Sequence, residues 1–261
     1  MRTAFFRRTV LSASAVSLAL LATACGGSSG TADGKSDAKP DTKPATSAPA
    51  AAGAKGKTAA ELAPLLVAQA DLPDHVLKPA TDEEIKAGTD LASDVAACLP
   101  LVQAQSMAPV GAPAGTARIK GVAKPKQDAD PDASEAEKAK AGLNALGSTV
   151  TAVALSSYDG KGAEEAFASL KSAGTTCAGG FGIRTGGDAG KISKVSPAAP
   201  VTAGDEALAY TLELDDSGDK ATTELVVVRK GSSLVTFSAI SLAGTAEQPK
   251  AVVAAQVKKL G

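Results

Sequence analysis

The side chains best suited to chemistry are few in this sequence, which holds three cysteines and one histidine. They are Cys25, Cys98, Cys177 and His75. A thiolate can attack a substrate, bind a metal or enter a disulfide, and an imidazole can move protons or bind a metal. For Cys98 and Cys177, a disulfide is favoured over two free thiols of a redox centre, because the chain has no C-x-x-C spacing.

His75 follows Asp71-Leu72-Pro73-Asp74. A Ser-His-Asp hydrolase needs a positioned nucleophile, and the G-x-S-x-G motif that would supply one is missing. A metal held by His75, Asp71 and Asp74 would need further ligands, and the sequence has no second histidine to supply one. We therefore predict no catalytic residue, no metal site and no cofactor, and we expect the chain not to be an enzyme.

Three further stretches resemble ligand loops only loosely. Residues 179–182 (GGFG) lack the Lys-Ser/Thr pair of a phosphate-binding loop, so we interpret them as a turn. Residues 215–219 (DDSGD) lack the twelve-residue spacing to a Glu that calcium loops have, so we interpret them as a hairpin turn. The acidic run 128–137 is typical of a solvated loop.

Composition restricts the class of partner. The 261 residues contain 27 Lys and Arg against 28 Asp and Glu, which gives a net charge of -1. Nucleic-acid binders usually carry a basic excess. Aromatic residues make up 3% of the chain and Trp is absent, so stacking surfaces for bases or sugars are scarce. We expect no nucleic-acid partner.

Residues 1–24 have the pattern of a signal peptide. Arg2, Arg7 and Arg8 precede an apolar stretch at residues 9–24, and no acidic residue interrupts them. A transmembrane helix needs about 20 predominantly apolar residues, and this stretch is shorter and contains serines. Because Arg7 and Arg8 also loosely resemble a twin-arginine signal, both Sec and Tat export stay open.

Residues 21–25 (LATAC) resemble a bacterial lipobox, in which the thiol receives a diacylglyceryl group and the cysteine becomes the mature N-terminus. The alternative is ordinary secretory cleavage after Ala24. Lipidation of Cys25 is favoured because it leaves Cys98 and Cys177 as an even pair in an exported chain. Two acyl chains hold a protein stably on a bilayer, so we expect a lipid anchor on the outer face of the cell membrane.

Two segments are too poor in apolar residues to fold by themselves. Residues 26–57 contain no Leu, Ile, Val, Met or aromatic residue. Such a segment cannot offset its ordering entropy, so residues 25–57 are predicted to be a lipidated Cys followed by a disordered tether with a reach of roughly 30 Å. Residues 124–142 are predicted to be a flexible loop. The folded domain is then residues 58–261.

The domain alternates helical and strand patterns. Four helices are expected: one that begins with the capping box of Thr58 and Glu61, one that is capped by Ser93 and carries Cys98, one with Ala163, Phe167 and Leu170 on one face, and a last one that begins at Thr245 and Gln248. Strands are expected at 149–155, 208–214, 225–229 and 234–240. The three later strands predict a meander. The fold class is α+β, an antiparallel β-sheet with flanking helices, and Cys98 and Cys177 are expected to form one disulfide.

The motifs of this domain occur in a characteristic order, namely residues 70–73 (ADLP), the helix with Cys98, the strand and turn at 150–159, the helix at 163–170 that leads to Cys177, and the stretches 204–210, 226–231 and 234–238. This order resembles the extracellular PknH-like sensor domain of actinobacterial kinases and lipoproteins. The family implies an antiparallel sheet flanked by helices and a surface groove for an unidentified extracellular ligand. Kinase versions carry two disulfides, whereas this chain can form one, and its sequence has no kinase motif.

We therefore expect a non-enzymatic ligand-binding or sensor lipoprotein that takes a small-molecule, lipid or cell-wall ligand in a cleft between sheet and helices. The alternative is a carrier of lipids or glycolipids, which needs an enclosed apolar cavity. The sequence does not identify the groove residues.

Overall fold

The computed structural model describes residues 53, 55–124, 134–137, 149–185, 188–216, 219–241 and 245–261. All of them belong to the compact unit Thr46–Gly261. The predicted signal peptide, Cys25 and most of the predicted tether and of the predicted 124–142 loop lie outside the described residues.

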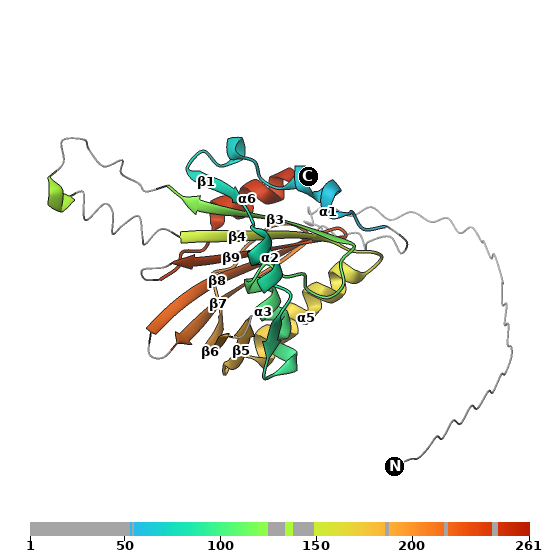
Figure 1. Cartoon of the computed structure of the whole chain (residues 1–261). Coiled ribbons are helices and arrows are strands. Elements are labelled where there is room, and N and C mark those ends of the chain that lie inside the picture. The colour runs from blue at the N-terminus through green and yellow to red at the C-terminus, as the bar shows by residue number, and fades with distance from the viewer. Residues whose placement is uncertain are drawn as a thin grey trace, which may run out of the picture. The chain divides into compact units, whose positions relative to one another are not determined.

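One antiparallel sheet forms the centre of the domain (Figure 1). Its strands are β1 (His75–Pro79), β2 (Leu91–Ser93), β3 (Gly115–Ala123), β4 (Thr149–Ser157), β5 (Phe181–Thr185), β6 (Asp188–Pro197), β7 (Glu206–Asp216), β8 (Asp219–Lys230) and β9 (Ser233–Ser241). Within the described residues, these nine strands lie side by side in the order β1-β3-β4-β9-β8-β7-β6-β5-β2. The predicted meander is confirmed as β7, β8 and β9.

Helices pack on both faces of the sheet. They are α1 (Ala59–Leu62), α2 (Asp82–Ala87), α3 (Leu99–Gln105), α5 (Gly162–Thr176) and α6 (Lys250–Lys259), with short 3-10 turns η1 (Ala63–Leu65), η2 (Gln69–Asp71) and η3 (Ala96–Cys98). One hydrophobic core joins α3 and α5 to the sheet, and a second core joins α1 and α6 to the opposite face (Figure 1). The predicted fold class, an antiparallel sheet with flanking helices, is confirmed.

Strand β8 explains why the sheet needs helices on both sides. Leu225 and Val227 belong to the core under α3 and α5, while Val226 and Val228 belong to the core under α1 and α6. Successive side chains of a strand point to opposite faces, so an uninterrupted apolar run must be covered on both. All four of these side chains are buried, which places β8 at the centre of the domain.

A buried amide attaches the start of the domain to its last helix. The Gln256 side chain is fully buried, and its Oε1 accepts a hydrogen bond from the Val67 N–H at 2.9 Å. Its Nε2 donates to the Leu65 carbonyl at 2.8 Å. Because both ends of the amide are paired, this polar group is accommodated inside an apolar layer.

The predicted disulfide is confirmed. Cys98 and Cys177 are bonded, with their Cα atoms 5.8 Å apart and a sequence separation of 79. Cys98 ends η3 directly before α3, and Cys177 follows the last residue of α5. The disulfide therefore ties together the two helices that cover one face of the sheet.

The sequence placed two helix starts wrongly. Ser93 ends strand β2, and the helix that carries Leu101 and Val102 begins only at Leu99, after a 3-10 turn. The last helix begins at Lys250 with Pro249 before it, and not at Thr245. The Gln248 amide, expected to cap that helix, donates to the Ala199 carbonyl at 2.8 Å, because a tertiary partner replaces the local one.

The described end of the predicted tether is attached to the domain. The Gly56 N–H donates to Asp159 Oδ1 at 2.7 Å, and the Lys57 N–H donates to Ser157 Oγ at 3.0 Å. A Cβ atom at Gly56 would lie 2.7 Å from the Ala114 Cβ, so only glycine fits this approach. Residues 56 and 57 thus continue directly into the capping box of Thr58 and Glu61, which the structure confirms.

Candidate functional site

The site begins where strand β6 stops beside β7. The β6–β7 ladder ends with Pro197 opposite Tyr210, whereas β7 itself begins earlier, at Glu206. Proline has no N–H to donate and is confined to strand ends and edges. Beyond it, the Ala198 N–H makes one more bond, to the Ala209 carbonyl at 3.0 Å. Among the described strands, the start of β7 is therefore paired with β8 on one side only.

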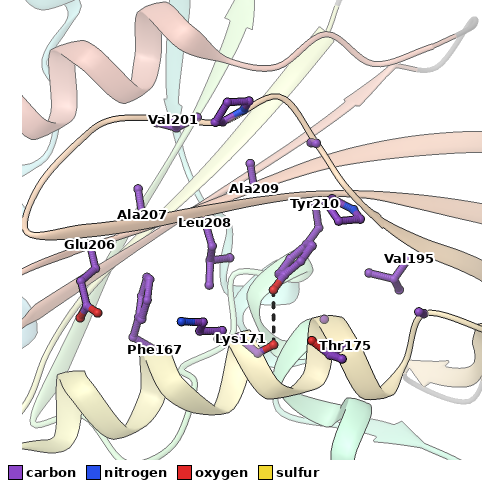
Figure 2. A pocket seen from close by; sticks show the side chains of 15 residues that line it. Phe167, Lys171, Thr175, Val195, Val201, Glu206, Ala207, Leu208, Ala209 and Tyr210 are labelled. Carbon is purple, nitrogen blue, oxygen red and sulfur yellow. Dashed lines mark hydrogen bonds between the residues drawn. The ribbon is translucent and has the colours of Figure 1, made fainter.

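A pocket of about 740 Å³ lies at this free part of β7. Helix α5, the start of β7, the end of β6 and the loop between these two strands line it (Figure 2). The lining side chains are mostly apolar or small, and they include Phe167, Gly174, Ala178, Val195, Pro197, Val201, Leu208 and Tyr210. Concave sites of this size and character are where proteins hold small ligands.

Tyr210 lies against the α5 wall through an unusually close approach. A Cβ atom at Gly174 would lie 2.1 Å from the Tyr210 Cζ, so the ring occupies the space that any other residue at position 174 would need. The Tyr210 hydroxyl points to the Lys171 carbonyl, at a distance of 3.4 Å (Figure 2). Burial raises the pKa of the Tyr210 phenol. Gly174 thus allows the helix and the strand to form one continuous wall.

Two charged side chains of opposite sign, Glu206 and Lys171, reach the pocket. Glu206 Oε2 accepts a hydrogen bond from Arg229 Nε at 2.6 Å, and the Arg229 side chain is 6% exposed. Lys171 is exposed on α5, and no ion pair of its ammonium group occurs within the part of the chain that is described. Arg229 also lies 3.4 Å from Asp205 Oδ2, so it is shared between two carboxylates. The Lys171 ammonium group, beside apolar side chains, is the group of the pocket that can attract an anionic group of a ligand.

The disulfide supports the helical wall of the pocket. Cys177 follows the end of α5, and the Ala178 carbonyl directly after it accepts a hydrogen bond from the Val195 N–H at 3.2 Å. Both Ala178 and Val195 line the pocket. The covalent bond and this hydrogen bond hold the end of α5 at a set distance from β6.

The tyrosines give a test of this packing, since Tyr158 and Tyr210 are the two tyrosines of the chain. Burial raises the pKa of Tyr158 to about 12, and the Tyr158 hydroxyl donates to the Val110 carbonyl at 2.7 Å. A tyrosine in the unfolded chain ionises near pH 10. The contribution of Tyr158 to stability is therefore fully present below about pH 10 and is lost as the pH rises through 12, by about 2 kcal/mol at that pH.

We expect phenolate absorbance to stay low in the native protein at pH 10.5 and to rise when urea unfolds it. The free energy of unfolding measured in urea should fall between pH 10 and pH 12. A Tyr158→Phe variant, which has no phenol at this position, should show a clearly smaller fall. Half-ionisation of both tyrosines near pH 10 in the folded protein would contradict the burial described here.

The residues that the sequence offered as candidate metal ligands, His75, Asp71 and Asp74, do not form a site. His75 lies in β1, which is several strands away from β7 in the sheet order. Asp71 accepts a hydrogen bond from the Ala68 N–H and lies 3.0 Å from Lys259 Nζ, and these two contacts lower the pKa of its carboxyl. Among the described residues, no group of His, Cys, Asp and Glu side chains could hold a metal ion.

The two loop-like motifs take the turn positions expected of them. Gly180 has a φ of +89° and its N–H donates to the Cys177 carbonyl, so it turns the chain from the disulfide into β5. Asp216 pairs with Asp219 at the β7–β8 hairpin. The acidic run 128–137 lies largely outside the described residues, and its described part, 134–137, is exposed.

The sequence predicted several pocket residues to lie in a helix or a strand, but it did not predict that they line a pocket. Phe167 belongs to the expected helix face, and Leu208 and Tyr210 belong to the expected strand. Lys171 belongs to no sequence motif. It lines the pocket only because β7, a distant segment of the chain, lies beside α5. The one local signal is the stretch Pro197–Ala198–Ala199–Pro200, whose prolines mark the place where β6 must end.

Comparison with solved structures finds chains of similar fold. No protein-family model matches the chain, and no curated protein matches it. The fold is similar to the crystal structure of the extracellular domain of PknH from Mycobacterium tuberculosis, with a TM-score of 0.45 and 12% sequence identity. The match covers 79% of this chain and 97% of that chain.

Within the described residues, none of the helices combines the length and the apolar character needed to cross a lipid bilayer.

Proposed function

We propose that this chain is a membrane-anchored, extracytoplasmic lipoprotein that binds a ligand without chemical turnover and acts as a sensor or binding module. The pocket between α5, β7 and the β6–β7 loop is its binding site. The observation that carries this proposal is the ammonium group of Lys171, which has no ion pair within the described residues, beside a largely apolar pocket of about 740 Å³. A ligand with an apolar body and an anionic group matches both features.

The anchor rests on the sequence, and a mass measurement tests it. We expect the intact mature chain from the envelope of its producer to begin at Cys25 and to carry the mass of a diacylglyceryl group. The mass should also be lower by two hydrogens than that of the reduced chain, because Cys98 and Cys177 are joined. A Cys25→Ser variant serves as the control and should be recovered from the medium without added lipid. A native chain that begins after Ala24 with a free thiol would overturn the anchoring.

The pocket is tested by filling it. Thr175 and Thr176 are neighbouring exposed residues at the end of α5, and of the two only Thr175 lines the pocket. We expect Thr175→Trp to place an indole in the pocket and to remove at least nine-tenths of any ligand that co-purifies from the producer, as measured by native mass spectrometry. Thr176→Trp adds the same side chain one position away and should leave the ligand bound.

The composition of the released ligand decides between binding module and carrier. Stoichiometric lipid or glycolipid in an organic extract would support the carrier function instead of the sensor function. Equal ligand loss in the two Trp variants would show that the pocket is not the binding site.

A further inference from the structure

The free part of β7 offers main-chain groups to the pocket. In an antiparallel strand, the N–H and C=O of one residue point to the same neighbouring strand, and the direction alternates along the chain. The Ala209 carbonyl accepts from Ala198, so Ala209 faces the β6 side. Ala207, two positions earlier, directs its N–H and C=O to the same side. In the part of the chain that is described, no strand lies beside Ala207 there.

The side chains around this edge form two compartments. Figure 2 shows Ala207 and Ala209 pointing toward the loop that carries Val201. Leu208 and Tyr210 point the other way, toward α5 and the side chain of Lys171 (Figure 2). A chain lying along the free edge would thus place alternate side chains in the loop compartment and in the helix compartment.

We propose that the ligand of this pocket is an extended peptide, which adds a short strand to the free edge of β7 in the place that β6 leaves at Pro197. This inference rests on the function proposed above. A peptide main chain supplies the C=O and N–H that pair with Ala207, and its alternating side chains match the two compartments. The free stretch Glu206–Leu208 spans about 10 Å, the length of three extended residues.

The charges and sizes in the pocket define the peptide further. A side chain in the helix compartment lies near Lys171, whose ammonium group forms no ion pair with any residue that the structure describes, so Asp or Glu is preferred there. A side chain in the loop compartment meets Val201 and the methyl group of Ala207, so a small or branched apolar residue is preferred there. An acyl chain or a glycan carries no main-chain amides in this alternation, and therefore it satisfies Ala207 less well.

The test uses the folded chain and defined peptide pools. N-acetylated, C-amidated hexapeptides, randomised except for one central residue fixed as Asp, Asn, Lys or Leu, are titrated against the protein. The best binder is then resynthesised with a single backbone N-methyl group at each position in turn. We expect the Asp pool to bind best and one N-methyl position to weaken binding about tenfold or more, the loss expected from about one hydrogen bond or more.

Matched variants locate the peptide on the protein. Ala207→Pro removes the N–H that faces the pocket and leaves the β7–β8 ladder intact, because proline is tolerated at an edge where its nitrogen faces away from the neighbouring strand. It should weaken binding about tenfold, whereas Ala207→Ser, which keeps the N–H and changes only the side chain in the loop compartment, should weaken binding clearly less. Lys171→Gln should remove the preference for Asp over Asn. The N-methyl series uses the unmodified protein, so it holds even if Ala207→Pro fails to fold.

The outcomes separate this inference from the proposed function. If no peptide pool binds more tightly to the parent protein than to Thr175→Trp, the peptide inference is wrong. A co-purifying lipid or glycan gives the second outcome. If Thr175→Trp loses it while Thr176→Trp and Ala207→Pro keep it, the pocket binds a non-peptide ligand and the proposed function stands. If neither a peptide nor a co-purifying ligand distinguishes Thr175→Trp from Thr176→Trp, both proposals fail.

Discussion

Replacing both disulfide cysteines, as Cys98→Ala and Cys177→Ala, should lower the free energy of unfolding by about 4–5 kcal/mol. The bond closes a loop of 79 positions, and cross-linking a loop of that length removes much of the conformational entropy of the unfolded chain. A loss of this size is comparable to the whole stability of many domains. We expect the midpoint of urea unfolding to fall to a low urea concentration, or the domain to be unfolded without urea.

Chemical reduction provides the matched control for this variant. The reduced parent chain and the double Ala variant both lack the cross-link and differ only in two buried thiols, so their unfolding curves should nearly coincide. The oxidised Cys25→Ser variant keeps the bond and should unfold like the parent domain. A difference of less than about 1 kcal/mol between the oxidised and reduced parent would contradict the expectation. In that case, the packing of α3 and α5 would suffice to hold the wall of the pocket.

Gly174→Ala should destabilise the domain by about 1–3 kcal/mol, as overpacked sites in protein cores do. Inside a helix, Ala is normally favoured over Gly by about 1 kcal/mol, so a loss of stability on this substitution would point to a steric clash. Here the added methyl group would lie 2.1 Å from the Tyr210 Cζ, so the ring must move out of its place in the pocket wall. The measurement is the free energy of urea unfolding, together with the ligand occupancy of the variant.

A double-mutant cycle assigns the effect to the ring. Tyr210→Leu removes the atoms that the methyl group would meet, so Gly174→Ala in that background should be neutral or stabilising. The coupling energy between the two positions should be about 2 kcal/mol. Gly179→Ala is the matched control, since a Cβ atom there meets nothing within 4 Å. Destabilisation by Gly174→Ala that is equal with and without the ring would show that Tyr210 is not the obstacle.

The elements predicted correctly are those whose apolar residues keep a regular period. In α5, Ala163, Phe167 and Leu170 recur at helical spacing, and all three are buried. Strands β7 and β9 alternate, and β8 is a continuous apolar run between them, so their neighbours in sequence are also their neighbours in the sheet. The disulfide was predictable because the sequence predicts export and lipidation of Cys25, which leave two cysteines with one intramolecular pairing open to them.

The elements missed are those whose period is interrupted or too short. Ile192 and Val195 of β6 both belong to the core under α5, although they are three positions apart. Strict alternation forbids this, and a bulge between Ile192 and Lys194 makes it possible. Strand β2 has three residues, and β1 contains the exposed Val76 and ends in Pro79, so neither carries a strand pattern of its own. These strands exist because the sheet supplies a partner for their backbone.

By itself, the sequence determined the cysteine pair, the apolar meander and the helix before Cys177, because these features are local or covalent. The export and lipidation signals remain predictions from the sequence. Only the tertiary structure decided where a ligand could bind. The pocket forms because β6 ends at Pro197 while β7 begins earlier, at Glu206, and because α5 lies beside that gap and brings Lys171 to it. Such a relation between distant segments leaves no periodic trace in either of them, since each segment has an ordinary helix or strand pattern.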